Sequence, residues 1–188
     1  MNIAFIHIPK TGGGSVIEWF NRNNLNKKLI FYGHKDLNQI KSLTSQNIDI
    51  SFCVVRNTYE RLISAYEFTY QKVKKKIFKN NNIEINQKIL DTYNNGIISF
   101  VEYMHSINHV TTRNQLEFSQ GVDFILHNDQ LSKYNKLNEL FKIDNIIKKE
   151  RRVNTYEDKS YYTNEFIDTV NTLYREEINY FGFTPKYK

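Results

Sequence analysis

Cysteine, proline and long apolar runs are all scarce in this chain of 188 residues. Cys53 is its one cysteine, so the chain contains no internal disulfide and no thiolate cluster for a metal ion. It lies in an apolar run, where a buried structural thiol is expected. No stretch approaches the roughly 20 apolar residues of a membrane-spanning helix, and the first residues have the pattern of a strand. We therefore expect neither a membrane span nor a cleavable leader, and predict a cytoplasmic protein.

The length and composition predict one folded domain over residues 1–188. A hydrophobic fraction of 40% supports a packed core. With two prolines and no internal repeat, no linker divides the chain. The net charge of +6 suits an enzyme with an anionic ligand, a nucleic-acid binder, or simply a basic solvated surface.

Short apolar runs alternate with amphipathic stretches along the chain. Strands are expected at residues 3–8, 29–32, 50–55 and 122–126. Helices are expected from residue 15 and at residues 37–43, 57–77, 99–104, 131–141 and 166–181, with a polar loop at 107–120. This alternation predicts an α/β fold: a three-layer sandwich with a mostly parallel central sheet and helices on both faces.

A glycine-rich loop follows the first expected strand. Glycines allow a close backbone approach, and the N–H groups of a following helix favour an anion. Lys10 adds a positive charge, and Thr11 and Ser15 add hydroxyl groups. In a nucleotide triphosphatase loop the lysine follows the glycines, whereas here it precedes them, and no acidic residue is evident for magnesium. The loop predicts a phosphate site, with a simple tight turn as the alternative.

A second pattern lies at the end of the third expected strand. Arg56 ends this strand, and Ser64 follows eight residues later, two turns into the next helix. Because ligands of open α/β sheets bind at the carboxyl edge of the strands, these side chains suit a second phosphate. The alternatives are an Arg56–Glu60 ion pair and a serine on a helix flank.

Together the two segments resemble the sulfotransferase superfamily, whose donor is 3′-phosphoadenosine 5′-phosphosulfate (PAPS). Pro9–Ser15 resembles the family's 5′-phosphosulfate loop, commonly PKTGGTS, and Val55–Tyr66 resembles its 3′-phosphate motif, commonly VRNPYERLVSAY. The similarity is nearest to the carbohydrate branch, which includes heparan-type 2-O-sulfotransferases and small bacterial relatives. Gly14 replaces the usual threonine, and Thr58 replaces the usual proline.

The resemblance implies the sulfotransferase form of the P-loop nucleotide-kinase fold. It implies transfer of the sulfuryl group from PAPS to an acceptor hydroxyl, on a carbohydrate, by in-line displacement. The product would be 3′,5′-ADP (PAP), and no metal ion is expected. Nucleic acid is not an expected partner. Sugar, lipid-linked glycan, small alcohol and protein tyrosine all stay open as the acceptor.

The resemblance also implies roles for individual residues. The 5′-phosphosulfate would be held by Lys10, Thr11, Gly12, Gly13, Gly14 and Ser15. The 3′-phosphate or adenine would be held by Arg56, Ser64, Arg152 and Asn154. An acceptor-facing loop would contain Arg113, Asn114 and Gln115.

The expected catalytic pair is Lys10, on the bridging oxygen, and His34, as the base and acceptor-side residue. Phe31–His34 resembles the strand end where the carbohydrate branch keeps a catalytic histidine, and the pKa of an imidazole suits a base. The fallback candidates are His105, His109 and Glu18, whereas His7 is expected to be packed.

Two other functions stay open from the residues alone. One is a small P-loop kinase that uses ATP. The other is a non-catalytic module that binds nucleotides or polyanions.

Overall fold

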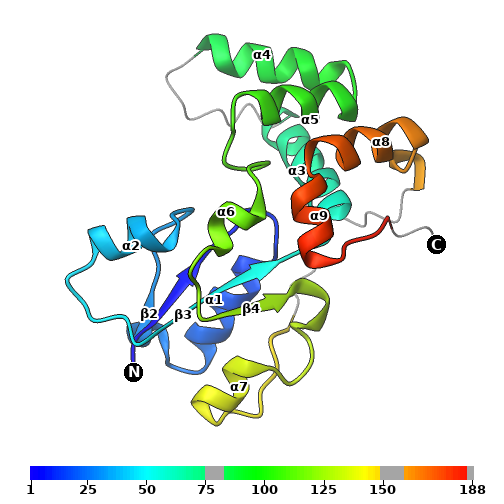
Figure 1. Ribbon diagram of the computed structural model, residues 1–188. Helices are drawn as coiled ribbons and strands as arrows, with labels where there is room; N and C mark the ends of the chain where they lie inside the picture. Colours follow the sequence, from blue (N-terminus) through cyan, green and yellow to red (C-terminus); the bar gives the residue numbers. More distant parts are fainter. Residues whose placement is uncertain (75–82, 149–158, 186–188) are drawn as a thin grey trace. The chain divides into compact units, whose positions relative to one another are not determined.

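The computed structural model describes residues 1–74, 83–148 and 159–185 (Figure 1). The described chain falls into two compact units. The first contains Met1–Arg56 and the described part of Asn114–Arg152, and the second contains Asn57–Arg113 and the described part of Val153–Lys188. Each unit is therefore built from stretches that are distant in sequence. The single domain stays a prediction.

The first unit contains a four-stranded parallel sheet. Its strands are β1 (Ile3–Ile6), β2 (Leu29–Ile30), β3 (Ile50–Val55) and β4 (Phe124–His127), in the order β2-β1-β3-β4. All four expected strands are present, within a few residues at their ends. Because the strands are parallel, their carboxyl ends meet at one edge, from which the segments after β1, β3 and β4 leave.

Helices flank this sheet. The helices of the first unit are α1 (Gly13–Arg22), α2 (Leu37–Leu43), α6 (Gln115–Ser119) and α7 (Lys136–Phe141), with 3-10 turns η1 (Asn26–Lys28) and η2 (Asn128–Gln130). Phe5 and Phe52 stack on one sheet face and pack with Phe20 of α1. On β3, Cys53 follows Phe52, so its side chain points to the opposite face of the sheet, where it is fully buried. The predicted α/β class is confirmed, with an all-parallel sheet.

The second unit is helical among its described residues. Its helices are α3 (Thr58–Lys74), α4 (Ile83–Asn94), α5 (Ile97–Ser106), α8 (Asn164–Leu173) and α9 (Arg175–Phe181), with a 3-10 turn η3 (Lys159–Tyr161). Helices α3, α5 and α8 pack together (Figure 1) around Leu62, Phe100 and Phe166. None of the helices in the described part of the chain is long and apolar enough to cross a membrane.

The start of α3 agrees with the helix expected from residue 57. Asn57 accepts a hydrogen bond from the Glu60 N–H at 3.4 Å, as expected for the cap of α3. The helix expected from residue 99 begins two residues earlier, as α5 after Gly96, with no side-chain cap. The end of the helix expected at residues 57–77 lies outside the described residues.

Three further helix predictions need correction. The expected loop at 107–120 contains α6, which Asn114 caps by accepting from the Leu116 N–H. The helix expected at 131–141 begins only at Lys136. The last helix breaks at Tyr174 into α8 and α9, and ends as predicted at Gly182, which has a left-handed conformation.

Candidate functional site

The glycine-rich loop connects β1 to α1 at the carboxyl edge of the sheet. Lys10 and Gly12 have positive φ angles of 67° and 99°. Gly12 is the N-cap of α1, and the first helical N–H groups belong to Gly13 and Gly14. Such N–H groups have no acceptor within the helix, and the helix dipole adds partial positive charge. The loop therefore has the local geometry of an anion site.

Three hydrogen bonds fix the backbone of this loop. The Thr11 hydroxyl donates to the Ile8 carbonyl at 2.8 Å. Asn128 Nδ2, just after β4, donates to the Thr11 carbonyl at 2.6 Å. Arg56 Nη1, just after β3, donates to the Lys10 carbonyl at 3.3 Å. The loop is thus held by its own side chain and by two neighbouring strand ends.

The loop residues differ in how accessible they are. Thr11 is fully buried, so its hydroxyl serves the loop through Ile8 rather than facing solvent. Gly13 is buried, Gly14 is exposed, and the remaining expected phosphate ligands Lys10, Gly12 and Ser15 are partly exposed. An anion that approaches the loop would therefore meet the accessible residues, which are Lys10, Gly12, Gly14 and Ser15.

Arg56 joins the two sequence motifs. Its guanidinium lies on the carbonyl of Lys10, although the two residues are 46 positions apart. Its own backbone is clamped by Gln115, whose Oε1 accepts from the Arg56 N–H and whose Nε2 donates to the Arg56 carbonyl, both at 2.9 Å. Gln115 is fully buried. The amide that was expected to face an acceptor is thus engaged in positioning Arg56.

His34 lies beyond the end of β2 and is exposed. Its Nδ1 is 2.9 Å from the carbonyl oxygen of His7. Because a carbonyl only accepts, we assign the hydrogen to Nδ1, which leaves Nε2 of the neutral ring as a hydrogen-bond acceptor. His34 therefore has the tautomer that a general base needs at Nε2.

His7 packs beside the loop, as expected. Its ring lies 5.4 Å from Phe5 and 5.5 Å from Phe31, measured between centroids. A Cβ added to Gly13 would lie 2.1 Å from Cδ2 and Nε2 of this ring. Nδ1 of His7 is buried and has no hydrogen-bond partner among the described residues. Burial, and then the charge of His34, lower the pKa of His7 to about 4, so the ring is neutral at neutral pH.

The fallback bases have other contacts. The His105 ring packs edge-on against Tyr174 at 5.2 Å, and His109 Nδ1 accepts from the Thr111 N–H at 3.2 Å. Glu18, on α1, forms an exposed ion pair with Arg22 at 2.8 Å. Among the candidates, His34 lies on a carbonyl of the segment that leads into the loop, that of His7.

The other predicted ligands belong to the second unit or lie outside the described residues. Ser64 belongs to the second unit and is buried on α3. Arg113 also belongs to that unit, where its carbonyl accepts from Arg61 at 2.9 Å. Arg152 and Asn154 lie outside the described residues.

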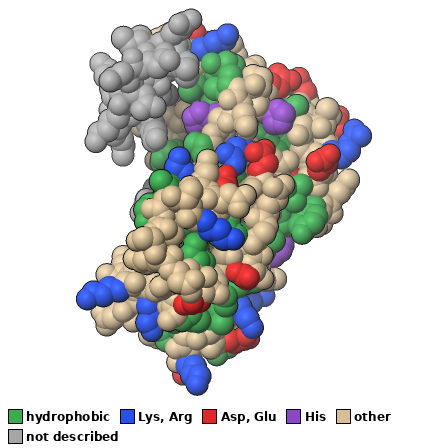
Figure 2. All heavy atoms as spheres, turned by 60° about the vertical axis from the view of Figure 1, so that its left-hand side comes forward, with side chains coloured by type: hydrophobic (Ala, Val, Ile, Leu, Met, Phe, Trp, Pro, Cys, Tyr) green, Lys and Arg blue, Asp and Glu red, His purple; other side chains and the backbone are tan. Residues whose placement is uncertain are grey.

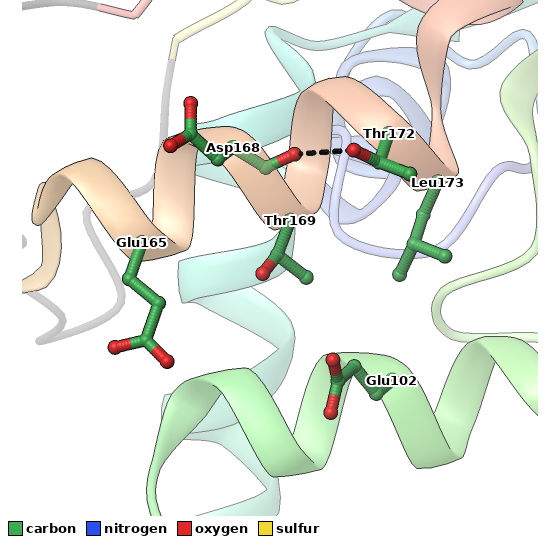
Figure 3. A pocket seen from close by; sticks show the side chains of 6 residues that line it. All are labelled: Glu102, Glu165, Asp168, Thr169, Thr172 and Leu173. Carbon is green, nitrogen blue, oxygen red and sulfur yellow. Dashed lines mark hydrogen bonds between the residues drawn. The ribbon is translucent and has the colours of Figure 1, made fainter.

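A hollow of about 510 Å³ lies in the second unit between α5 and α8 (Figure 3). It is lined by Glu102, Glu165, Asp168, Thr169, Thr172 and Leu173. Figure 3 shows the carboxylates of Glu102 and Glu165 beside the space between the two helices. Three carboxylates repel phosphate and sulfate groups, so this hollow does not suit the expected donor.

Sequence reasoning missed Asn128, which the structure places against the loop. Its signal was its position, two residues after the fourth expected strand and hence at the edge where ligands bind. In the described part of the chain, no group of three or more His, Cys, Asp or Glu side chains is arranged to hold a metal ion. Comparisons with protein-family models, with curated proteins and with solved structures find no match for this chain.

Proposed function

We propose that this protein is a PAPS-dependent sulfotransferase that acts on a hydroxyl acceptor, with the sulfotransferase form of the P-loop nucleotide-kinase fold. The observation that carries the proposal is the contact between Arg56 and the Lys10 carbonyl. It joins Arg56, from the segment that resembles the 3′-phosphate motif, to the loop that resembles the 5′-phosphosulfate loop, at one edge of a parallel sheet.

The accessible groups fit the two ends of the donor. The N–H groups of Gly12 and Gly14 suit the 5′-phosphosulfate, and Lys10, in the same loop, adds a positive charge. The Arg56 guanidinium suits the 3′-phosphate, which it would bind in a bidentate manner. The motif resemblance adds Ser64 as a second ligand of that phosphate.

The chemistry follows from these positions. The acceptor oxygen attacks sulfur in line, a new S–O bond forms, and the bond from sulfur to the bridging oxygen breaks. The electron pair stays on the 5′-phosphate of 3′,5′-ADP, where Lys10 neutralises it. The acceptor proton passes to Nε2 of His34. The His7 carbonyl, which accepts from Nδ1, then stabilises the imidazolium.

The acceptor is proposed to be a sugar hydroxyl, on the resemblance to the carbohydrate branch. An ATP-dependent kinase is less well supported, because Lys10 precedes the glycines and no lysine begins α1. Turnover in the presence of a chelator separates the two functions, since the kinase needs magnesium.

Calorimetric titration tests donor binding. Wild type should bind 3′,5′-ADP more tightly than 5′-AMP or ATP, because hydrogen bonds to a charged group are worth about 1.5–3 kcal/mol, or roughly 10- to 100-fold. Arg56→Ala should remove this preference. Arg22→Ala is the matched control, because Arg22 is an exposed arginine paired with Glu18. Equal affinities of wild type for 3′,5′-ADP and 5′-AMP would overturn the proposal.

Transfer of labelled sulfuryl from PAPS to unsulfated glycosaminoglycan oligosaccharides tests the base. His34→Ala should lower turnover by roughly 10²–10⁴-fold, the usual worth of general base catalysis, and leave 3′,5′-ADP binding unchanged. Lys35→Ala, at the exposed neighbouring position, should have wild-type turnover. Loss of 3′,5′-ADP binding in His34→Ala would instead assign His34 a structural role.

A further inference from the structure

We propose that Asn128 is a positioning residue of the anion loop: by holding the Thr11 carbonyl, its side chain aims the N–H of Gly12 at the phosphosulfate. This inference rests on the proposed function and deepens it. Asn128 itself touches the backbone of the loop and not the reacting atoms.

The argument begins with the geometry of the peptide bond. In a planar trans peptide the C=O and N–H bonds point in opposite directions. The Thr11 carbonyl and the Gly12 N–H belong to one such peptide, and the described chain contains no cis bond. Because Asn128 Nδ2 binds this carbonyl at 2.6 Å, the Gly12 N–H points away from Asn128.

Accessibility makes Gly12 the residue where this orientation matters. Its neighbours Thr11 and Gly13 are buried, whereas Gly12 is partly exposed. Rotation of the Thr11–Gly12 peptide would turn a carbonyl, rather than an N–H, toward an approaching anion. A fixed N–H avoids the cost of reorganisation when charge develops.

The fold explains why Asn128 can do this. Strands β3 and β4 pair with Val55 opposite His127, so the next residues on the two strands are Arg56 and Asn128. They donate to consecutive carbonyls, those of Lys10 and Thr11. The two clamps differ in charge: Arg56 also offers a cation to the ligand, whereas the neutral amide of Asn128 orients the backbone without competing for the anion.

Gly12 is matched to this clamp. A Cβ at Gly12 would lie 2.6 Å from Asn128 Nδ2, and the φ angle of 99° already favours glycine. The amide of Asn128 therefore occupies the space that a side chain at Gly12 would need. The Asn128 side chain and the absence of a side chain at Gly12 are thus complementary features of the anion loop.

The test is a titration of the full chain with inorganic pyrophosphate and then with 3′,5′-ADP, followed on backbone amide signals by NMR. In wild type the Gly12 signal should shift on binding. Asn128→Ala and Asn128→Asp should weaken pyrophosphate binding about tenfold, the size of one hydrogen bond to a charged group, and should reduce the Gly12 shift. In Asn128→Asp, a carboxylate that only accepts hydrogen bonds replaces the amide that donates to the Thr11 carbonyl.

Asn38→Ala, at an exposed position of α2, is the control and should bind as wild type does. If Asn128→Ala fails to fold, Asn128→Ser keeps a shorter donor and should show a partial loss of the Gly12 shift. A merely structural brace would lower the thermal midpoint of the variants but leave the Gly12 response to pyrophosphate intact.

Two results overturn the inference: unchanged pyrophosphate affinity and Gly12 shift in the folded variants, or a wild-type Gly12 signal that does not respond to pyrophosphate. The proposed function fails separately. A protein that binds pyrophosphate through Gly12 in an Asn128-dependent way, yet shows no preference for 3′,5′-ADP over 5′-AMP, keeps the inference and loses the sulfotransferase assignment.

Discussion

At the residue scale, the His7 ring occupies the space that a side chain at Gly13 would need. Because a Cβ at Gly13 would overlap the imidazole at 2.1 Å, Gly13→Ala should destabilise the protein. Overpacking of this kind costs about 1–3 kcal/mol, measured as the loss of unfolding free energy in urea. Combining Gly13→Ala with His7→Ala should recover part of this loss, because the ring that is displaced is no longer there.

Gly33→Ala serves as the control for Gly13→Ala. Its φ angle is 66° and no described atom lies within 4 Å of the added Cβ, so only the left-handed backbone penalty of roughly 1–2 kcal/mol applies. His7→Ala should not relieve that penalty. Strict additivity of Gly13→Ala and His7→Ala would contradict the contact between these two residues.

His7 also makes the stability depend on pH. Its folded pKa of about 4 lies below the ordinary value of 6.5, so the unfolded chain takes up a proton at a higher pH than the native protein. The contribution of the neutral ring is therefore full above pH 6.5 and is lost as the pH falls toward 4. It amounts to something on the order of 3 kcal/mol.

Urea unfolding of wild type and His7→Phe across this pH range measures the effect. Phenylalanine keeps the stacking on Phe5 and Phe31 but does not titrate. The unfolding free energy of wild type, minus that of His7→Phe, should therefore decrease as the pH falls from 6.5 to 4. A difference that is constant with pH would mean that His7 titrates alike in both states.

At the scale of elements, the strands were predictable because each is a short, mostly apolar run. β1 and β3 are buried almost throughout, as strands of a parallel sheet must be. Helix α6 was not predicted, because its five residues are too few to show a periodic apolar pattern. The break at Tyr174 was not predicted either, because the periodic apolar stripe continues through it from α8 into α9.

Only those residues of the site that belong to a short sequence motif were predictable. The loop and Arg56 each carry a motif, so both were found. The clamps at Gln115 and Asn128 act on backbone atoms 59 and 117 residues away, through strand neighbours that no spacing reveals. A polar residue after a strand indicates the edge of the sheet, but not the carbonyl that it binds.

Helix α3 carries a buried cation that holds the second unit together. Arg61 is fully buried, lies 3.9 Å from Glu177, and donates to the carbonyls of Thr111, Thr112 and Arg113. Arg61→Met should cost about 3–5 kcal/mol, because it removes the buried positive charge that lies 3.9 Å from the Glu177 carboxylate. Urea unfolding measures this loss.

Two further variants define the role of Arg61. Arg61→Lys should rescue little, since one ammonium does not reproduce the guanidinium fork toward three carbonyls. Arg175→Ala, at an exposed position of α9, should change the unfolding free energy by less than about 0.5 kcal/mol. A loss below about 1 kcal/mol in Arg61→Met would show that the network contributes little net stability.

At the scale of the whole molecule, each unit is assembled from separate stretches of the chain. The first unit receives β4 and α7 only after the chain has passed through residues 57–113. β4 pairs with β3, and Leu137 packs in the same core as Phe52 and Val54. A fragment that ends at residue 113 would therefore expose one side of β3, so functional tests belong on the full chain.

The net charge of +6 leaves a polyanion-binding module as the rival at this scale. On the face drawn in Figure 2, Lys and Arg side chains are scattered and lie near Asp and Glu rather than gathering in one basic patch. A built site with two cations, Lys10 and Arg56, and a diffuse basic surface respond differently to salt. Binding to a polyanion releases counterions in proportion to the phosphates neutralised.

Raising salt from about 50 to 200 mM should therefore weaken 3′,5′-ADP binding by less than about tenfold, and binding of single-stranded DNA by considerably more if several phosphates are neutralised. Fluorescence anisotropy and calorimetry at matched salt measure the two slopes. Arg56→Ala should abolish the selectivity for 3′,5′-ADP and leave DNA binding unchanged, because one cation of a diffuse surface matters little. Tighter binding to DNA than to 3′,5′-ADP at about 150 mM salt, equally reduced by Arg56→Ala and Arg22→Ala, would favour the module over the enzyme.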